Sequence, residues 1–569
     1  MKLVISEYLR TLKERDELDR LLPDLLSEIG YSLIARPQTG PRQFGVDLAV
    51  RGFNCESNQE ELILFVVKQG DIGRSEWDGS KQGVRASINE IFDGYLTSSV
   101  EPQDAGKPVR IVVTTNGDMK QTVLQTWAGF VDANQARAHF EFWGIDQLSA
   151  LVEKHLFDEK IFNNEDRHDL RRALALAGNS DYDRRDLYRL FLRALDLKPD
   201  ASLATNPKTG RSLIKALRIV NLSAHAFAAW AKPDGDMRQA INAMERALLW
   251  SWHRLQAAGE PNKEKVVADA FMSIWLGYFT TTRAYFEKLR QHYYVEDGLT
   301  GYYIDGCEFS LVAYEQIGLI SITGLIEVFS NSNDANESEQ HTENASVVAA
   351  ALAALIANNN ICNSPCLDRH SSEITLAMIL LISTGHTLVA KSWLQNLVLS
   401  IDYAYKTKRY APISSDSLDD LADEGGWHSG KTSDKLLDAS WMLATLAGWC
   451  AILEMDEYYS IIRNESKASY PETCMQLWHP ESGLYKLMYF KDACLENGVT
   501  EAPILLPETT AEWRKHMRLI VNSERGKVIK ESPAEREGIP ILDLIACRHY
   551  SSPVPPIYWY RIAAKLFPE

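Results

Sequence analysis

GVDLAVR (Gly45 to Arg51) and ELILFVVK (Glu61 to Lys68) are the two stretches that decide the fold of the first part of this chain. Both are short runs of apolar and β-branched residues, and the polar segment from Gly52 to Gln59 separates them. This pattern predicts two strands paired as a hairpin. Antiparallel pairing would bring Asp47, on the first strand, and Lys68, at the end of the second, to one edge of a sheet.

Helix and strand patterns alternate on both sides of this hairpin. Apolar residues at helical spacing stop at Gly30, a plausible C-terminal cap, and a short strand from Tyr31 to Arg36 follows. Beyond the hairpin the expected elements are a helix near 83–96, a strand at 109–115, a helix around 121–131, a strand at 140–143 and a helix at 148–155. This order predicts an α/β domain, with helices packed on a sheet, over residues 1–160.

The remainder of the chain is expected to be mostly α-helical. Steps of three and four place apolar residues on one face of a helix at Met237, Ile241, Met244, Leu248, Trp252 and Leu255. The stretch Ser330 to Asn344 contains no large apolar residue and is interpreted as a loop or linker. We therefore expect one helical domain over 163–330 and a second over 345–569, with a proline-rich, irregular C-terminus.

Composition limits the classes of function that fit this chain of 569 residues. Its formal net charge of −17 argues against a protein that coats nucleic acid, so any nucleic-acid contact must be a local patch. The amphipathic start lacks a secretory signal, and the apolar stretch 374–401 is interrupted by polar residues, which favours a buried helix pair over a membrane span. We expect a cytoplasmic protein with no membrane partner.

Three stretches together resemble the Mrr-like branch of the PD-(D/E)xK nucleases: LDRLLPDLLSEIGY (Leu18 to Tyr31), GVDLAV and ELILFVVKQGD. The segment FEFWGIDQLSALVEKHL also resembles the closing unit of such domains in bacterial anti-phage and restriction proteins. The resemblance implies a restriction-endonuclease-like fold and a Mg²⁺- or Mn²⁺-dependent nuclease, with DNA a better expected substrate than RNA. It also implies a role in prokaryotic antiviral defence, with possible protein partners in a defence complex or a homo-oligomer.

The resemblance assigns roles to particular residues of this sequence. Asp47 corresponds to the main metal ligand, Lys68 to the residue that stabilises the transition state, and Asp19 to a supporting acid. Val66 stands where the family carries a metal-binding Glu or Gln, and an isopropyl group cannot bind Mg²⁺. A neighbouring acid, Glu76 or Glu90, would then have to supply the second ligand.

Two hypotheses follow from this departure. In the first, the chain is a Mg²⁺-dependent endonuclease that hydrolyses phosphodiesters with a metal-activated water, with Asp47 and Glu76 as metal ligands. In the second, the nuclease-like domain has lost its chemistry and serves as a scaffold or sensor subunit. A second carboxylate close to Asp47 would favour the first hypothesis.

Two further motifs are interpreted as structural. GGWHSGKT (Gly425 to Thr432) matches a phosphate-binding loop, but the acidic residues before it do not predict the buried strand that such a loop must follow. Cys362, Cys366, Asp368 and His370 could offer zinc ligands, but no second pair at metal-ligand spacing accompanies them. An interhelical loop is the better interpretation of that cluster.

Overall fold

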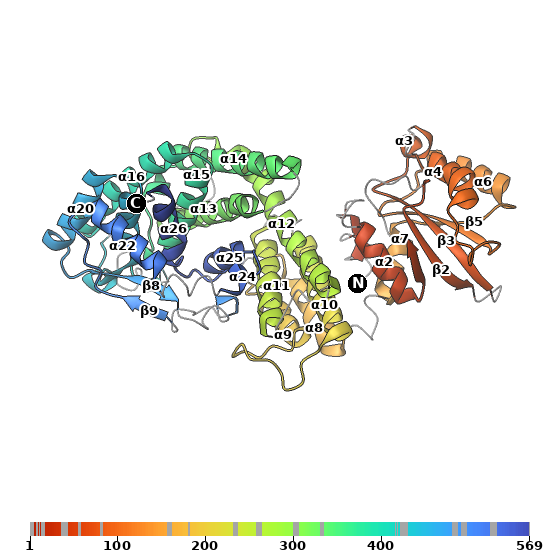
Figure 1. Ribbon diagram of the computed structural model, residues 1–569, viewed down its shortest axis with the longest axis horizontal. Coiled ribbons are helices and arrows are strands. Elements are labelled where there is room, and N and C mark those ends of the chain that lie inside the picture. The colour runs from red at the N-terminus through yellow and green to blue at the C-terminus, as the bar shows by residue number, and fades with distance from the viewer. Residues whose placement is uncertain are drawn as a thin grey trace. The chain divides into compact units, whose positions relative to one another are not determined.

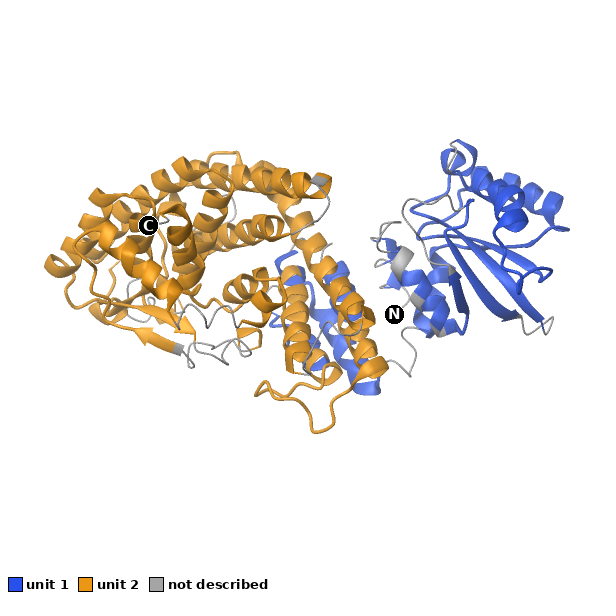
Figure 2. Ribbon diagram, in the orientation of Figure 1, with its two compact units in different colours: residues 1–190, 222–240 blue, residues 191–221, 241–569 orange. Residues whose placement is uncertain are grey.

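The structure is a computed structural model. It describes residues 5–567 except 7–8, 11, 13–17, 36–43, 55–58, 80–82, 156–161, 180–181, 232–236, 258–264, 300–305, 331–334, 416, 418, 421–430, 481–487, 491–497 and 524–531. The chain divides into two compact units, one of residues 1–190 and 222–240 and one of residues 191–221 and 241–569 (Figure 2).

The first unit contains a five-stranded mixed sheet with the strand order β1-β2-β3-β4-β5 (Figure 1). The first three strands pair antiparallel, and β3, β4 and β5 run parallel. The elements of this α/β part are α2 (Asp19–Ile29), β1 (Ser32–Ala35), β2 (Leu48–Asn54), β3 (Gln59–Lys68), α3 (Arg74–Asp78), α4 (Val84–Glu90), the π-helix η2 (Ile91–Tyr95), α5 (Leu96–Ser98), β4 (Val109–Thr115), α6 (Gln121–Asn134), β5 (His139–Trp143) and α7 (Ile145–His155). The predicted α/β layering is confirmed.

Strand β3 is the centre of this sheet and is covered on both faces. Residues 61–67 are all buried, which explains why the strand is a nearly unbroken apolar run. Helices α3, α4 and α6 cover one face through Trp77, Val84, Ile88 and Val123, which pack with Leu62, Leu64 and Val66. Helices α2 and α7 lie together on the other face (Figure 1).

The predicted hairpin and the predicted helix end are both present. Leu48 pairs with Phe65 and Arg51 with Leu62, so the polar segment between the strands is shorter than expected, because β2 continues to Asn54 and β3 begins at Gln59. Gly30 ends α2 in the left-handed conformation, with φ of 102°. This is the backbone geometry that glycine adopts at a helix C-terminus.

Gly45, just before β2, lies so close to the backbone of α4 that there is no room for a side chain. Its φ is 75°, and a Cβ atom added there would lie 2.1 Å from the backbone oxygen of Ser87 in α4. Both the conformation and the close approach require glycine. Gly129 lies on the exposed side of α6, where an added Cβ atom would meet no other group within 4 Å and the backbone makes no such conformational demand.

We expect Gly45→Ala to destabilise the α/β part by about 2 kcal/mol or more, because the substitution combines left-handed strain with a backbone clash. Gly129→Ala is the matched control, and it should stabilise α6 by about 0.5–1 kcal/mol through its higher helix propensity. Amide hydrogen exchange of peptides from β2, β3 and α6 in the full chain measures both effects. Equal protection of β2 and β3 in Gly45→Ala and wild type would show that the loop adapts.

The rest of the chain is mostly helical, as the apolar spacing predicted. Its longer helices are α8 (Asn164–Leu176), α9 (Arg185–Ala194), α10 (Gly210–Ala231), α11 (Met237–Ala257), α12 (Lys265–Tyr293), α13 (Gly306–Phe329), α14 (Ala335–Asn358), α15 (Ser371–Ser383), α16 (Thr387–Thr407), α19 (Trp441–Ile452), α20 (Asp456–Ala468), α22 (Thr510–Asn522), α25 (Ile541–His549) and α26 (Pro556–Leu566). Short elements between them are η4 (Asn360–Asn363), η5 (Asp368–His370), η6 (Asp434–Leu436), β6 (Ala439–Ser440), β7 (Cys474–Met475), β8 (Leu477–Pro480), β9 (Gly498–Glu501) and α24 (Pro533–Arg536).

Two expectations about the helical region are wrong. Residues 331–334 of the polar stretch interpreted as a loop or linker lie outside the described structure, but residues 335–344 form the first turns of α14. Residues 336–340 there are exposed and therefore need no apolar side chains. The C-terminal prolines do not prevent helices of 13, 9 and 11 residues, because Pro556 occupies the start of α26 and Pro540 immediately precedes α25. Proline is well tolerated at the first helical position, since that N–H has no partner within the helix.

Among the residues that the structure describes, one helix is long and apolar enough to cross a membrane by length and composition. Within α13, residues 307–329 have a mean hydropathy of 1.5 in an 18-residue window, and 78% of that window is buried. A buried core helix has the same character. The apolar stretch 374–401 forms α15 and α16, which confirms the predicted helix pair.

A buried ion network joins α11 to α25 in the second unit. The Glu245 carboxylate is fully buried and binds the Arg548 guanidinium, His549 Nδ1 at 2.8 Å and the Tyr278 hydroxyl at 2.7 Å. Burial alone would raise the pKa of Glu245, but Arg548 and His549 outweigh it and lower that pKa to about 2. A buried charge of this kind is stable only with its partners in place.

Candidate functional site

Asp47 lies at the bend that leads into β2, where the backbone of β3 holds it in place. Its N–H donates to the Phe65 carbonyl at 3.0 Å, and its Oδ2 accepts from the Val67 N–H at 2.7 Å. Lys68 follows Val67 directly and is half-buried at the end of β3. The hairpin therefore brings Asp47 and Lys68 to the same edge of the sheet, as its pairing pattern led us to expect.

Val66 belongs to the core and has no access to a ligand. It is completely buried in the cluster that includes Ala49 and Leu64. Ala49 pairs with Leu64, and the same register continued by two residues sets Asp47 opposite Val66. Lys68 shares the face of Val66 because side chains alternate along a strand. This end of the hairpin thus carries Asp47 and Lys68, while Val66 packs in the core.

Glu76, predicted as the second metal ligand, caps helix α3. Its Oε2 accepts from the Gly73 N–H at 3.0 Å and its Oε1 accepts from the Ser75 hydroxyl at 2.6 Å. The Ser75 hydroxyl and the backbone N–H groups of Glu76 and Gly73 hold the pKa of the Glu76 carboxyl below its usual value. Both oxygens are thus used locally, and metal binding by Glu76 stays a prediction that would require these bonds to open.

The structure says less about the other two predicted acids, Asp19 and Glu90. Asp19 is the first residue of α2, and its side chain lies outside the described part of the structure. Glu90 is exposed at the last position of α4. Neither residue contributes a described contact to the edge that carries Asp47 and Lys68.

Asn116, which sequence reasoning did not single out, organises the loop after Lys68. Its side chain is 2% exposed, and its Oδ1 accepts from the Gly70 N–H at 2.7 Å. Its Nδ2 donates to the carbonyls of Leu9 and Leu12 at 2.8 and 2.7 Å. The only signal in the sequence is a polar Thr-Thr-Asn directly after the apolar run of β4. Asn116 ties the N-terminal segment to the backbone two residues beyond Lys68.

We expect Asn116→Ala to cost about 3 kcal/mol, because it leaves the Gly70 N–H and the carbonyls of Leu9 and Leu12 without partners. Hydrogen exchange should rise at residues 9–12 and 69–72. The matched control is Asn134→Ala, which removes one 2.9 Å bond to the Phe130 carbonyl from a partly exposed amide. Equal exchange of both loops in Asn116→Ala and wild type would contradict the proposed clamp.

The described residues offer a Mg²⁺ ion only one carboxylate at this end of the hairpin, that of Asp47. No group of three or more His, Cys, Asp or Glu side chains suited to a metal lies within the described part of the chain. Mg²⁺ in phosphate-transferring sites is commonly held by one or two carboxylates together with water and substrate phosphates. Asp47 supplies one such carboxylate at the sheet edge, so the residues present fit a cation that the substrate itself helps to hold.

The two motifs interpreted as structural give no other centre among the described residues. Asp368 is buried and accepts from the Ser440 hydroxyl and the Trp441 and Met442 N–H groups, so it caps α19. His370 stacks on Tyr314 with ring centroids 4.4 Å apart. Of the phosphate-loop motif, residues 425–430 lie outside the described structure, and no described strand precedes Lys431 in the way that such a loop requires.

Comparison with known proteins gives no match for this chain among protein-family models, curated proteins or solved structures. The resemblance to PD-(D/E)xK nucleases therefore stays a prediction from the residues of this chain.

Proposed function

We propose that the α/β part is a restriction-endonuclease-like domain that hydrolyses phosphodiester bonds of nucleic acid, with DNA the favoured substrate. The single observation that carries the proposal is the position of Asp47, whose carboxylate bonds to the residue directly before Lys68. Paired acidic and cationic groups at one sheet edge suit the charge that develops on a phosphate during hydrolysis. In the setting that the resemblance implies, the activity serves as an effector of prokaryotic antiviral defence.

In this proposal each residue has one role. The Val67 N–H holds one carboxylate oxygen of Asp47, which limits the orientations that the carboxylate can take. Lys68 faces the scissile phosphate and offsets its growing negative charge. Asp47 and the substrate phosphate would hold Mg²⁺ or Mn²⁺, which would supply Lewis-acid polarisation and a bound water of lowered pKa. Asn116 fixes the loop after Lys68 and acts as a positioning residue.

The second candidate function is a non-catalytic nucleic-acid-binding scaffold or sensor. The observation that favours it is Val66, which is completely buried at the position where the family carries a metal ligand. Such a domain would keep the fold and the cationic Lys68 but not the second carboxylate that strengthens metal binding. The two candidates differ in whether bound nucleic acid is cut.

We expect the purified full chain to cleave plasmid, linear duplex or single-stranded DNA in Mg²⁺ or Mn²⁺. Asp47→Asn and Lys68→Ala should each lower the rate by about a hundredfold or more, because each removes a charge that acts on the transition state. The amide oxygen of Asn can still accept from the Val67 N–H, so the hairpin should be preserved. RNA is tested in parallel.

The matched controls are Asp93→Asn and Lys154→Ala, which change exposed charges elsewhere in the same unit. Both should cleave as wild type does. Cleavage that persists in stably folded Asp47→Asn and Lys68→Ala would refute the catalytic assignment. Binding without any cleavage by wild type would establish the scaffold instead.

A further inference from the structure

The segment 163–190 carries an arginine-rich surface in a chain whose net charge is −17. Among its described residues, Arg171, Arg172, Arg185 and Arg189 are exposed, whereas only two acids, Glu165 and Asp183, are exposed. All of these residues lie on α8, on α9 or in the turn between them. Any nucleic-acid contact by so acidic a protein requires a local patch of this kind.

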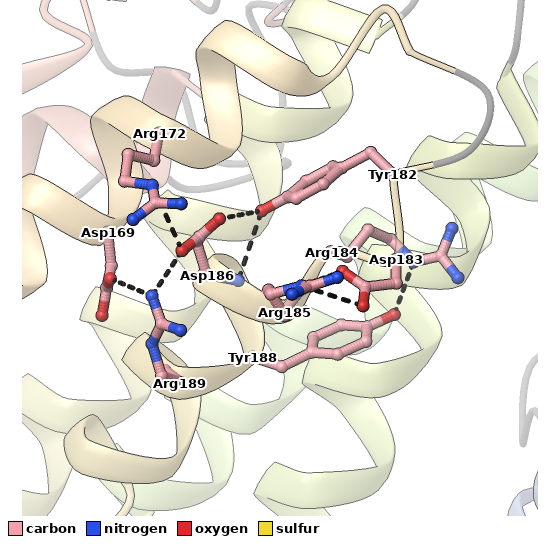
Figure 3. A network of polar contacts seen from close by, with 9 residues as sticks. All are labelled: Asp169, Arg172, Tyr182, Asp183, Arg184, Arg185, Asp186, Tyr188 and Arg189. Carbon is pink, nitrogen blue, oxygen red and sulfur yellow. Dashed lines mark hydrogen bonds and ion pairs between the residues drawn. The ribbon is translucent and has the colours of Figure 1, made fainter.

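Two of these arginines are held side by side by buried carboxylates. Arg189 binds both Asp186 and Asp169, the latter at 2.8 Å, and Arg172 Nε lies 3.6 Å from Asp186 Oδ1 (Figure 3). The side chains of Asp186 and Asp169 are only 1% and 7% exposed. The Tyr182 hydroxyl also donates to Asp186 at 3.1 Å. Burial, and then Asp186 itself, raise the pKa of Tyr182, so that hydroxyl keeps its proton.

The guanidinium groups themselves remain open to solvent. The side chains of Arg172 and Arg189 are 54% and 46% exposed. Within the part of the chain that the structure describes, Nη1 and Nη2 of Arg172 donate no hydrogen bond, and neither do Nε and Nη1 of Arg189. An anion that approaches from solvent can therefore bind the unused N–H groups of Arg172 and Arg189. The acids that balance these charges, Asp169 and Asp186, are buried.

This arrangement differs from the arginines that serve the fold alone. Arg110, for example, lies between Glu61 and Glu141 across three strands and is only 16% exposed. The N–H groups of Arg110 are used within this row of charged side chains across the sheet. In the Arg172–Arg189 pair, hydrogen bonds to Asp169 and Asp186 restrict Arg189, and Arg172 is attracted to Asp186 at 3.6 Å. The other N–H groups of both side chains stay free, and restricting Arg189 lowers the entropy lost when a phosphate binds.

We propose that Arg172 and Arg189 form a phosphate-binding site that holds the backbone of nucleic acid. The inference rests on the proposed function for the choice of nucleic acid as the source of the phosphate. The planar fork of each guanidinium matches two phosphate oxygens and reads no base, so the site binds without regard to sequence. Arg171, exposed on the same helix as Arg172, adds further positive charge to α8.

The test is equilibrium binding of fluorescent duplex DNA, single-stranded DNA and RNA to the full chain in EDTA, at several salt concentrations. Arg172→Gln should weaken binding about tenfold and reduce the slope of log K against log salt by about 0.9 for duplex or 0.7 for single strands. In this variant Asp186 retains its ion pair with Arg189 and its hydrogen bond from Tyr182, so the fold should be preserved. Arg189→Lys keeps the charge and the ion pairs and should bind less tightly, because an ammonium lacks the fork.

The matched control is Arg85→Gln, since Arg85 is 45% exposed and pairs with Asp78, which is 58% exposed. It should bind as wild type does. Equal affinity and salt slope for Arg172→Gln and wild type would overturn the site, and so would absence of binding by wild type at low salt. Complete displacement of nucleic acid by inorganic phosphate at matched ionic strength would assign the site to free phosphate and overturn the choice of nucleic acid.

The same variants separate this inference from the proposed function. If Asp47→Asn still cleaves while Arg172→Gln binds weakly, the catalytic assignment fails and the phosphate site stands. If Asp47→Asn abolishes cleavage while Arg172→Gln binds normally, the phosphate site fails alone.

Discussion

The pairing of β2 with β3 is the constraint on which the α/β part depends. The Asp47 N–H bonds to the Phe65 carbonyl, and the Asp47 carboxylate bonds to the Val67 N–H. A slip of one residue would turn Lys68 to the opposite face and expose the apolar side chains that bury against α4 and α6. The hydrophobic core and the charged edge are thus products of a single register.

Much of this fold could be predicted because its signals are local. The apolar run of β3, the alternation of helix and strand patterns and the cap at Gly30 each depend on neighbouring residues. Errors arose where burial, rather than composition, decided the structure. The first turns of α14 are helical although they are polar. They are exposed, and the C-terminal half of the helix provides the buried apolar residues.

The candidate site was only partly predictable, for a related reason. Asp47 and Lys68 are about twenty residues apart and a hairpin brings them together, so their proximity follows from a local pattern. Asn116 acts on carbonyls more than a hundred positions earlier in the chain. Arg172 meets Asp186 only through the packing of two helices. Contacts of this kind produce no periodic pattern in the sequence, so only the three-dimensional structure shows them.

The Glu245 network has a consequence for how this protein is made. Glu245 is enclosed in its unit with Arg548 and His549, which lie about three hundred residues later. While the chain is being synthesised, Glu245 leaves the ribosome about three hundred residues before Arg548, the guanidinium that balances its charge. The carboxylate must therefore stay hydrated until Arg548 has been made, since burial without a partner is strongly unfavourable. A chain that stops before Arg548 would leave the Glu245 carboxylate without its guanidinium partner, and α11 could then not bury this residue as it does here.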